Sequence, residues 1–475
     1  MRRPLRTDQA WWLMGIRATR AARAIYGFRA GRRLLRRPSF RARVTWTPIL
    51  ALVVFGGTLA ALTFPSLPRL GRRAAERAFG PARVARVTFL FARPGLAVAG
   101  AGLMLLAGAV APGAAVAAVD RPTLALLFGM MALVAGLEVA GFFGWTAAAI
   151  VRRVRTARGF LLATMALAAG LSALALNDAV VLLLTPVLVR ACRAMDLPCF
   201  PFLAAEAVAA NIGSLATPVG NPQNAAIALA SGMSFARFVA VLAPAALVAL
   251  VLAALVALVW FRRVLARPVR RVEPAFEPLD RPLLALALGV LALVLAGFVV
   301  APAGFTLGDV ALAGGLLLLV AAWAGARVPP ARLLARVDWG ILALFIGLFV
   351  LMAGFRDAGL LAGFEGALAA MRPDTVPGLA VVTAVLSNLV SNVPAVLLLA
   401  PTAAAQGGDL PWLVLATAST LAGNATLVGA AANLIVAEAA RGRGEDVDAL
   451  RFLAFGLPVT LVTLAAALAV VLALA

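Results

Sequence analysis

Apolar segments about as long as a membrane-spanning helix follow one another through most of this 475-residue chain. A spanning helix needs about 20 consecutive, mainly apolar residues, and runs of that order fall at about 46–64, 94–111, 121–145, 199–231, 234–260, 282–301, 305–324, 338–356, 411–437 and 449–475. Polar side chains and helix breakers interrupt some of them, most densely between Asn211 and Asn224. Such breaks survive at membrane depth only where protein or a water-filled cavity covers the backbone. The sequence therefore predicts an integral membrane protein whose interrupted segments line a binding site.

The composition agrees with a membrane protein and excludes several kinds of chemistry. Hydrophobic residues make up 63% of the chain, and all 42 basic residues are Arg because Lys and His are absent. A Walker A loop needs Lys, and a Ser–His–Asp triad or a helical zinc-protease motif needs His. Without a clear carboxylate pair or nucleophile–base pair, an enzyme is not expected. The net charge of +22 is attributed to cytoplasmic loops that face anionic lipid, not to nucleic acid.

Two further apolar stretches, at about 159–190 and 375–405, are each split by polar residues near their middle. A stretch broken there suits a re-entrant hairpin better than a single crossing. If the first hairpin enters and leaves by one face, the Arg-rich loops 152–158, 190–196 and 262–281 share that face. The positive-inside rule makes it cytoplasmic, so the second hairpin opens outside.

The N-terminal residues 1–45 carry thirteen Arg and are predicted to form a basic arm on the cytoplasmic membrane surface. A simple crossing by 46–64 would place this arm outside, so its side stays open. The predicted organisation is the arm, a first transmembrane repeat at 46–261, a cytoplasmic linker at 262–281 and a second repeat at 282–475.

Three sequence patterns occur twice in the same order, which indicates an internal duplication. Ala135–Gly141 matches Ala353–Gly359, Ser172-x4-Asn177-x8-Pro186 matches Ser387-x4-Asn392-x8-Pro401, and Thr217-x2-Gly220-x3-Asn224 matches Thr426-x2-Gly429-x3-Asn433. Because the hairpins open to opposite faces, the repeats are inverted, as in secondary transporters with a midplane site. The predicted fold class is an all-α polytopic membrane protein. Each inverted repeat has about five transmembrane helices plus one re-entrant hairpin, with broken helices at the midplane.

The polar residues of the hairpin tips and broken helices form the candidate substrate- and ion-binding site. Unwound carbonyl groups and Ser, Thr or Asn side chains suit a hard cation, and half-helix N-termini suit an anion. Ordinary hydrogen bonding between helices is the alternative for the amides. The candidate residues are Asn177, Asp178, Asn211, Gly213, Thr217, Gly220, Asn221, Pro222 and Asn224 of the first repeat, and Ser391, Asn392, Asn424, Thr426, Gly429 and Asn433 of the second.

Charged residues in the apolar segments are candidates for a proton path or a gate. Asp178 is interpreted either as a buried carboxylate that takes a cation or a proton, or as an N-cap for a helix that begins at Ala179. Glu138, Glu206 and Arg356 are candidates for the proton path or gate. No structural metal and no organic cofactor is expected; Na+, bound at the hairpin tips, or H+ is the candidate coupling ion.

Residues 95–475 resemble the ion transporter superfamily, which includes divalent anion:sodium symporters, citrate-type permeases and arsenite permeases. The blocks NDAVVLLLTP and NIGSLATPVGNPQN look most like its small bacterial anion-permease branch. The resemblance implies a scaffold domain, a moving transport domain with two hairpins, and a homodimer. The symporters carry Ser-Asn-Thr at each hairpin tip. The matching positions here are Leu176-Asn177-Asp178 and Ser391-Asn392-Val393, which share only the Asn.

We therefore expect a secondary active transporter of the bacterial inner membrane, in contact with lipid and without a nucleic-acid partner. Its substrate is expected to be a small anion, with citrate or a dicarboxylate as candidates, moved by alternating access coupled to a sodium or proton gradient. An arsenite or antimonite permease and a sodium/proton antiporter are the alternatives within the superfamily. An ion or solute channel is the alternative from another class.

Overall fold

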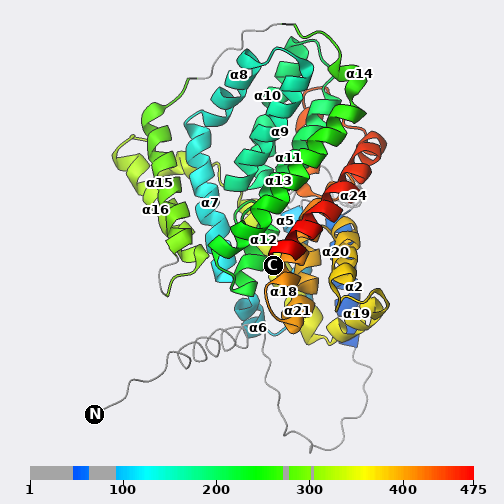
Figure 1. Cartoon of the computed structure of the whole chain (residues 1–475). Coiled ribbons are helices and arrows are strands. Elements are labelled where there is room, and N and C mark those ends of the chain that lie inside the picture. Colours follow the sequence, from blue (N-terminus) through cyan, green and yellow to red (C-terminus); the bar gives the residue numbers. More distant parts are fainter. Residues whose placement is uncertain (1–45, 64–92, 271–277, 301–303) are drawn as a thin grey trace, which may run out of the picture.

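The computed structural model describes residues 46–63, 93–270, 278–300 and 304–475, which form helices joined by short connections (Figure 1). No strand occurs among these residues, and the predicted all-α fold is confirmed. Seven of the described helices are long and apolar enough to span a membrane, or eight if one bent pair counts as a span. The predicted basic arm at 1–45 lies outside the described residues.

The first repeat contains ten described helices. They are α2 (Trp46–Thr63), α5 (Arg93–Leu106), α6 (Pro112–Ala118), α7 (Arg121–Val139), α8 (Phe142–Arg153), α9 (Ala157–Leu174), α10 (Asn177–Ala194), α11 (Phe200–Ser214), α12 (Pro222–Ser231) and α13 (Phe235–Trp260). The short α14 (Arg262–Leu265) follows.

The second repeat has the same order of long helices. It contains α15 (Arg281–Val300), α16 (Leu307–Ala324), α17 (Pro330–Leu334), α18 (Trp339–Asp357), α19 (Leu360–Leu368), η2 (Ala369–Met371), α20 (Val376–Val390), α21 (Asn392–Gln406), α22 (Leu410–Ala422), α23 (Ala431–Arg441) and α24 (Ala449–Leu474). Counting each broken pair, α11–α12 and α22–α23, as one segment, each repeat supplies five such segments and one hairpin.

Helices of the first repeat pack against helices of the second. Helix α16 of the second repeat packs against α7 of the first, α5 of the first packs against α18 of the second, and α13 packs against α24. Equivalent helix starts are also capped alike, because the Thr156 and Thr375 side chains accept hydrogen bonds from the N–H groups of Gly159 and Gly378. The duplication seen in the sequence is thus repeated in packing and in local hydrogen bonding.

The predicted segment 121–145 is not a single helix. Helix α7 ends at Val139, and α8 begins at Phe142. Gly141 lies between them with φ of 81°, a left-handed conformation that glycine adopts without steric cost. Its equivalent in the second repeat, Gly359, has φ of 75° and separates α18 from α19 in the same way. The Ala-Gly motif that marks the duplication is therefore a turn.

Both predicted hairpins are present, with arms that pack against each other. Helices α9 and α10 are separated by Ala175 and Leu176, and α20 and α21 by Ser391 alone, whose φ is 74°. The first hairpin extends over 157–194, beyond the predicted 159–190, and its entering arm α9 is long enough to span by itself. Each tip therefore lies where two helices meet end to end.

The hydrophobic cores divide the long helices into two units. We call α9–α13 and α20–α24 the hairpin unit, because most of the residues of one core come from these helices. We call α2, α5, α7, α15, α16 and α18 the scaffold unit. Its helices contribute most of two other cores, one of which includes Leu176 and Val180 of the first hairpin. The hairpin tips therefore pack against the scaffold unit.

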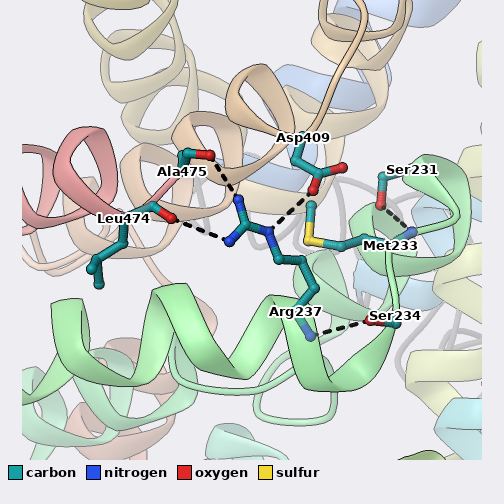
Figure 2. Close-up of polar contacts among 7 residues, drawn as sticks. All are labelled: Ser231, Met233, Ser234, Arg237, Asp409, Leu474 and Ala475. Atoms are coloured by element: carbon teal, nitrogen blue, oxygen red, sulfur yellow. Dashed lines mark hydrogen bonds and ion pairs between the residues drawn. The ribbon is translucent and has the colours of Figure 1, made fainter.

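Arg237 on α13 joins the two repeats within the hairpin unit, as Figure 2 shows. Its guanidinium pairs with Asp409 before α22 at 3.3 Å and donates to the carbonyl oxygens of Leu474 and Ala475 at the end of α24. Arg451 is the third residue of α24, as Arg237 is of α13, and lies 4.7 Å from the centre of the Phe200 ring at the start of α11. The third residue of α13 and of α24 is thus an Arg that contacts the other repeat, through an ion pair and hydrogen bonds at Arg237 and through a cation–π contact at Arg451.

Candidate functional site

The two hairpin tips line one cavity of about 70 Å³, which we call the tip cavity. The first tip contributes Asn177 and Asp178, and the second contributes Ser391 and Asn392. On the side of the scaffold unit, the cavity is lined by side chains from α2, α5 and α18, namely Leu62, Arg93, Ile341, Leu344, Phe345 and Leu348. Sequence positions more than 200 residues apart are thus brought to one site, as the duplication predicts.

Four helices of the hairpin unit begin at the tip cavity. Helix α10 begins at Asn177, α12 at Pro222, α21 at Asn392 and α23 at Ala431, and each of these residues lines the cavity. The first N–H groups of a helix lack partners within the helix and carry a partial positive charge. Two helix starts from each repeat therefore present a field that favours a negatively charged group.

A buried chain of amides connects the first tip with the second repeat. Asn177 Nδ2 donates to Asn211 Oδ1 at 3.0 Å, and Asn211 Nδ2 lies 2.9 Å from the Oδ1 atoms of both Asn424 and Asn433. The Asn177 N–H also donates to the carbonyl of Gly220 at 2.9 Å. Since unpaired buried polar groups are costly, this chain fixes the position of the first tip.

Asn224 and Asn433 stabilise the two breaks in the same way. Asn224 Nδ2 donates to the carbonyls of Ser214 and Thr217, both at 3.1 Å. Asn433 Nδ2 donates to the equivalent carbonyls of Gly423 and Thr426 at 2.8 and 2.9 Å. These carbonyls are freed where α11 and α22 unwind. Both amides thus satisfy backbone behind the cavity and do not line it.

The glycines at the first break allow close approach of backbone. A Cβ on Gly220 would lie 2.2 Å from the Ser214 carbonyl oxygen, and one on Gly213 would lie 2.1 Å from the Ala169 carbonyl oxygen. Thr217 Oγ1 donates to the Ala173 carbonyl at 2.6 Å. These three predicted site residues therefore hold the break in place and support the cavity from outside.

A second set of polar contacts crosses between the repeats beside the cavity. Asn221 caps α12 by accepting from the Asn224 N–H, and its Nδ2 donates to Thr420 Oγ1 at 3.2 Å. Asn392, oriented so that both its amide atoms are paired, donates to the carbonyls of Ser419 and Gly429 and accepts from Gln223 Nε2 at 3.2 Å. The second tip is thus fixed by the broken helices of both repeats.

Asp178 is not the N-cap of a helix. Helix α10 begins one residue before it, and the Asp178 N–H donates to Asn177 Oδ1 at 2.9 Å. The Asp178 carboxylate lines the tip cavity and also a second cavity of about 80 Å³. Of the described residues that line the tip cavity, Asp178 is the one carboxylate.

The three candidates for a proton path or gate have separate surroundings. Glu138 lines the second cavity and pairs with Arg336, which precedes α18, at 2.6 Å. Glu206 is fully buried in α11, with both carboxylate oxygens 3.0 Å from Thr185 Oγ1. Arg356 is exposed and pairs with its neighbour Asp357. Only Glu138 shares a cavity with Asp178.

Three residues near the site were not predicted. Gln223 lines the tip cavity but stood between predicted residues in the NPQN run. Asn388 accepts from Thr426 Oγ1 at 3.0 Å and donates to the Ala422 carbonyl, which supports the second break. Arg93 lines the tip cavity, although it precedes an apolar segment where a loop residue was expected. Two sequence signals could have identified these residues. Asn388 is a polar residue just before the second tip, and Arg93 begins an apolar segment with an Arg-Pro pair.

The family comparison covers most of the chain. A family model described as citrate transporter matches residues 84–422. The putative transporter arsB of Dictyostelium discoideum is 26% identical over 78% of this chain and 86% of that protein. The silicon efflux transporter LSI3 of Oryza sativa subsp. japonica is 29% identical over 88% of this chain and 96% of that protein.

A solved structure shares the fold. The crystal structure of the Alcanivorax borkumensis YdaH transporter aligns with a TM-score of 0.53 and 17% identity, covering 80% of this chain and 89% of that chain. The family model and both relatives are transporters, in agreement with the inverted repeat and the tip cavity. The chain belongs to the citrate transporter family, a branch of the ion transporter superfamily.

Proposed function

We propose that this multi-pass membrane protein is a secondary active transporter that carries a small anion by alternating access. The observation that supports this most is the convergence of four helix starts from two inverted repeats on one cavity. Helix N-termini attract anions, and inverted repeats with broken helices are the architecture of alternating access. In this proposal the hairpin unit moves against the scaffold unit and exposes the tip cavity to each side in turn.

The size of the tip cavity favours a substrate smaller than citrate. Its volume of about 70 Å³ is roughly half that of an engineered cavity of about 150 Å³ that holds benzene. An anion with few non-hydrogen atoms, such as acetate or an inorganic oxyanion, suits this space better than a tricarboxylate. We therefore place small monoanions ahead of citrate and dicarboxylates among the candidate substrates.

We propose a proton as the coupling ion and retain sodium as the alternative. Asp178 supplies a carboxylate to the tip cavity, and a carboxylate can bind and release a proton during the transport cycle. A different observation supports sodium as the coupling ion. Asn224 Oδ1 is buried without a hydrogen-bond partner among the described residues, and an amide oxygen is a ligand that hard cations accept.

Transport of a small uncharged oxoacid is the second candidate function. Two relatives are named as a putative arsB transporter and a silicon efflux transporter. The amides of Asn177 and Gln223 at the tip cavity can hydrogen-bond hydroxyl groups. At neutral pH arsenite is present mainly as uncharged arsenous acid. Uptake of this compound therefore distinguishes the second candidate from an anion transporter in a single assay.

The test is uptake into proteoliposomes that contain the purified protein. Acetate, phosphate, sulfate, succinate, citrate and arsenite are offered under a proton gradient, a sodium gradient or neither. We expect saturable uptake of a small anion that the proton gradient accelerates. Uptake of arsenite alone would favour the second candidate, and flux insensitive to both gradients would indicate a channel. A bacterial inner-membrane location and a homodimer stay predictions.

A further inference from the structure

Arg93 brings a positive charge from the scaffold unit to the tip cavity. It is the first residue of α5, which packs against α18, and its half-buried side chain lines the cavity together with both hairpin tips. Among the described residues around this cavity, Arg93 is the one cation. A guanidinium offers five N–H donors in a planar fork that matches a carboxylate or an oxyanion. The cavity therefore holds the donor that an anion needs, beside four helix starts.

Two carboxylates are the charged neighbours of Arg93. Arg93 interacts electrostatically with Asp178 of the first tip and with Glu438 of α23. None of the ion pairs within 4 Å among the described residues includes Arg93. The guanidinium and the Asp178 carboxylate thus attract each other without touching, and the tip cavity that both line can hold a ligand.

Asp178 has further charged neighbours that affect its protonation. Asp338, before α18, interacts with it electrostatically. The Glu138–Arg336 pair lies on the second cavity that Asp178 also lines. Arg93 and Arg336 attract the Asp178 carboxylate, while Asp338 and Glu138 repel it. Arg93 is the cation on the side of the hairpin tips, where the substrate is proposed to bind.

We propose that Arg93 binds the substrate anion, and that the Asp178 carboxylate competes with the anion for this guanidinium until a proton neutralises it. The inference rests on the proposed function and specifies its site. One proton is taken up on a carboxylate oxygen of Asp178 and one negative charge is taken up at Arg93. The pair enters and leaves together, so the loaded site has the same net charge as the empty one. This balance selects a small monoanion as the substrate class.

The position of Arg93 also couples binding to movement. Arg93 belongs to the scaffold unit, whereas Asp178 belongs to the hairpin unit. A proton without the anion leaves the Arg93 charge uncompensated, and the anion without a proton leaves the Asp178 charge uncompensated; either uncompensated charge opposes movement of the hairpin unit. The charges are balanced in the empty site and in the site that holds both. The empty and the fully loaded protein are therefore free to move, as coupled uptake requires.

Binding measurements on charge variants test the inference. Acetate, phosphate, sulfate and citrate are titrated against detergent-purified protein, with thermal stabilisation as the signal. We expect Arg93→Gln to weaken binding of the stabilising anion by about tenfold or more, the loss of one charge-assisted hydrogen bond. Arg93→Lys keeps the charge and retains part of the affinity. Arg281→Gln is the matched control, because Arg281 also begins a scaffold helix with Arg-Pro but is exposed and outside the cavity.

Asp178→Asn supplies the second arm. We expect it to tighten anion binding at neutral pH and to remove the pH dependence of binding. In an Arg93→Gln background the same substitution should no longer tighten binding, because the competition for the guanidinium is gone. The melting temperatures of all variants without anion check that each one is folded.

The outcomes separate the inference from the proposed function. Wild-type affinity in Arg93→Gln, or equal tightening by Asp178→Asn with and without Arg93, overturns the inference while gradient-driven uptake by the wild type still supports the transporter. If no anion stabilises the wild type and no gradient drives uptake, the proposed function is overturned and the inference with it.

Discussion

The two repeats build the same frame around the tip cavity and supply it with different side chains. The frame includes Asn224 and Asn433, which bind equivalent freed carbonyls. At the cavity itself, Asn177 and Asn392 are shared, but Asp178 faces Val393 in the sequence match and the NPQN run faces Ala430–Asn433. Side chains that hold the breaks are thus kept in both copies, whereas the side chains that line the cavity differ beyond the shared Asn. Both charged residues that line the tip cavity, Arg93 and Asp178, come from the first repeat.

The largest predicted effect concerns the amides that both tips share. Asn177→Ala and Asn392→Ala should each reduce transport by about 100-fold or more while the protein stays folded. Each change alters the lining of the proposed binding cavity and leaves buried partners such as Asn211 or Gln223 unpaired, a loss of about 1–3 kcal/mol for each unpaired group. Initial uptake rates in proteoliposomes measure this, with size-exclusion profiles as the control for folding. Wild-type uptake in either variant would remove the shared tips from the site.

The next prediction separates the two breaks by stability. A Cβ on Gly220 would lie 2.2 Å from the Ser214 carbonyl oxygen, whereas one on Gly429 would lie 2.6 Å from the Asn388 side chain and 2.8 Å from the Gly423 carbonyl oxygen. Because the backbone contact is closer at Gly220, Gly220→Ala should destabilise the protein by about 3 kcal/mol and Gly429→Ala by about 1 kcal/mol. Unfolding midpoints of the two variants in detergent decide the matter. The reverse order would show that the first break is the more adaptable one.

The third prediction concerns the position at which the tips differ most. Asp178→Asn should abolish stimulation of uptake by a proton gradient, since the amide cannot bind the proton. Val393→Asn at the matching position should alter the KM for the anion but keep the stimulation. The ratio of uptake with and without the gradient is the measurement. Loss of stimulation in both variants would mean that the coupling depends on tip geometry and not on the carboxylate.

The smallest effects are expected where Arg237 and Arg451 join the repeats. Arg237→Ala removes an ion pair and two bonds to carbonyls, and we expect a loss of about 1–2 kcal/mol in stability. Arg451→Ala removes the cation–π contact with Phe200, worth about 0.5–1 kcal/mol at an exposed site. Thermal unfolding of both variants ranks them. A larger loss for Arg451→Ala would reverse this comparison.

Much of the fold could be predicted because the sequence patterns of the hairpins and broken helices occur twice in the chain. Hairpins and broken helices leave polar residues in apolar sequence, and their repetition at Asn177 and Asn392 identifies the tips. The turn at Gly141 was missed because one glycine hardly lowers the hydropathy of an apolar run. The contribution of Arg93 could not be predicted, since it depends on α5 of one repeat packing against α18 of the other. No local pattern encodes that exchange.

Anion accumulation driven by a proton gradient tests the central claim most directly. Wild-type proteoliposomes, acidic outside, are supplied with a labelled small monoanion, with and without a proton ionophore. We predict saturable accumulation above the external concentration, which the ionophore abolishes. Unsaturable flux that stops at equal concentrations, whether or not a proton or sodium gradient is present, would contradict a coupled transporter at the tip cavity.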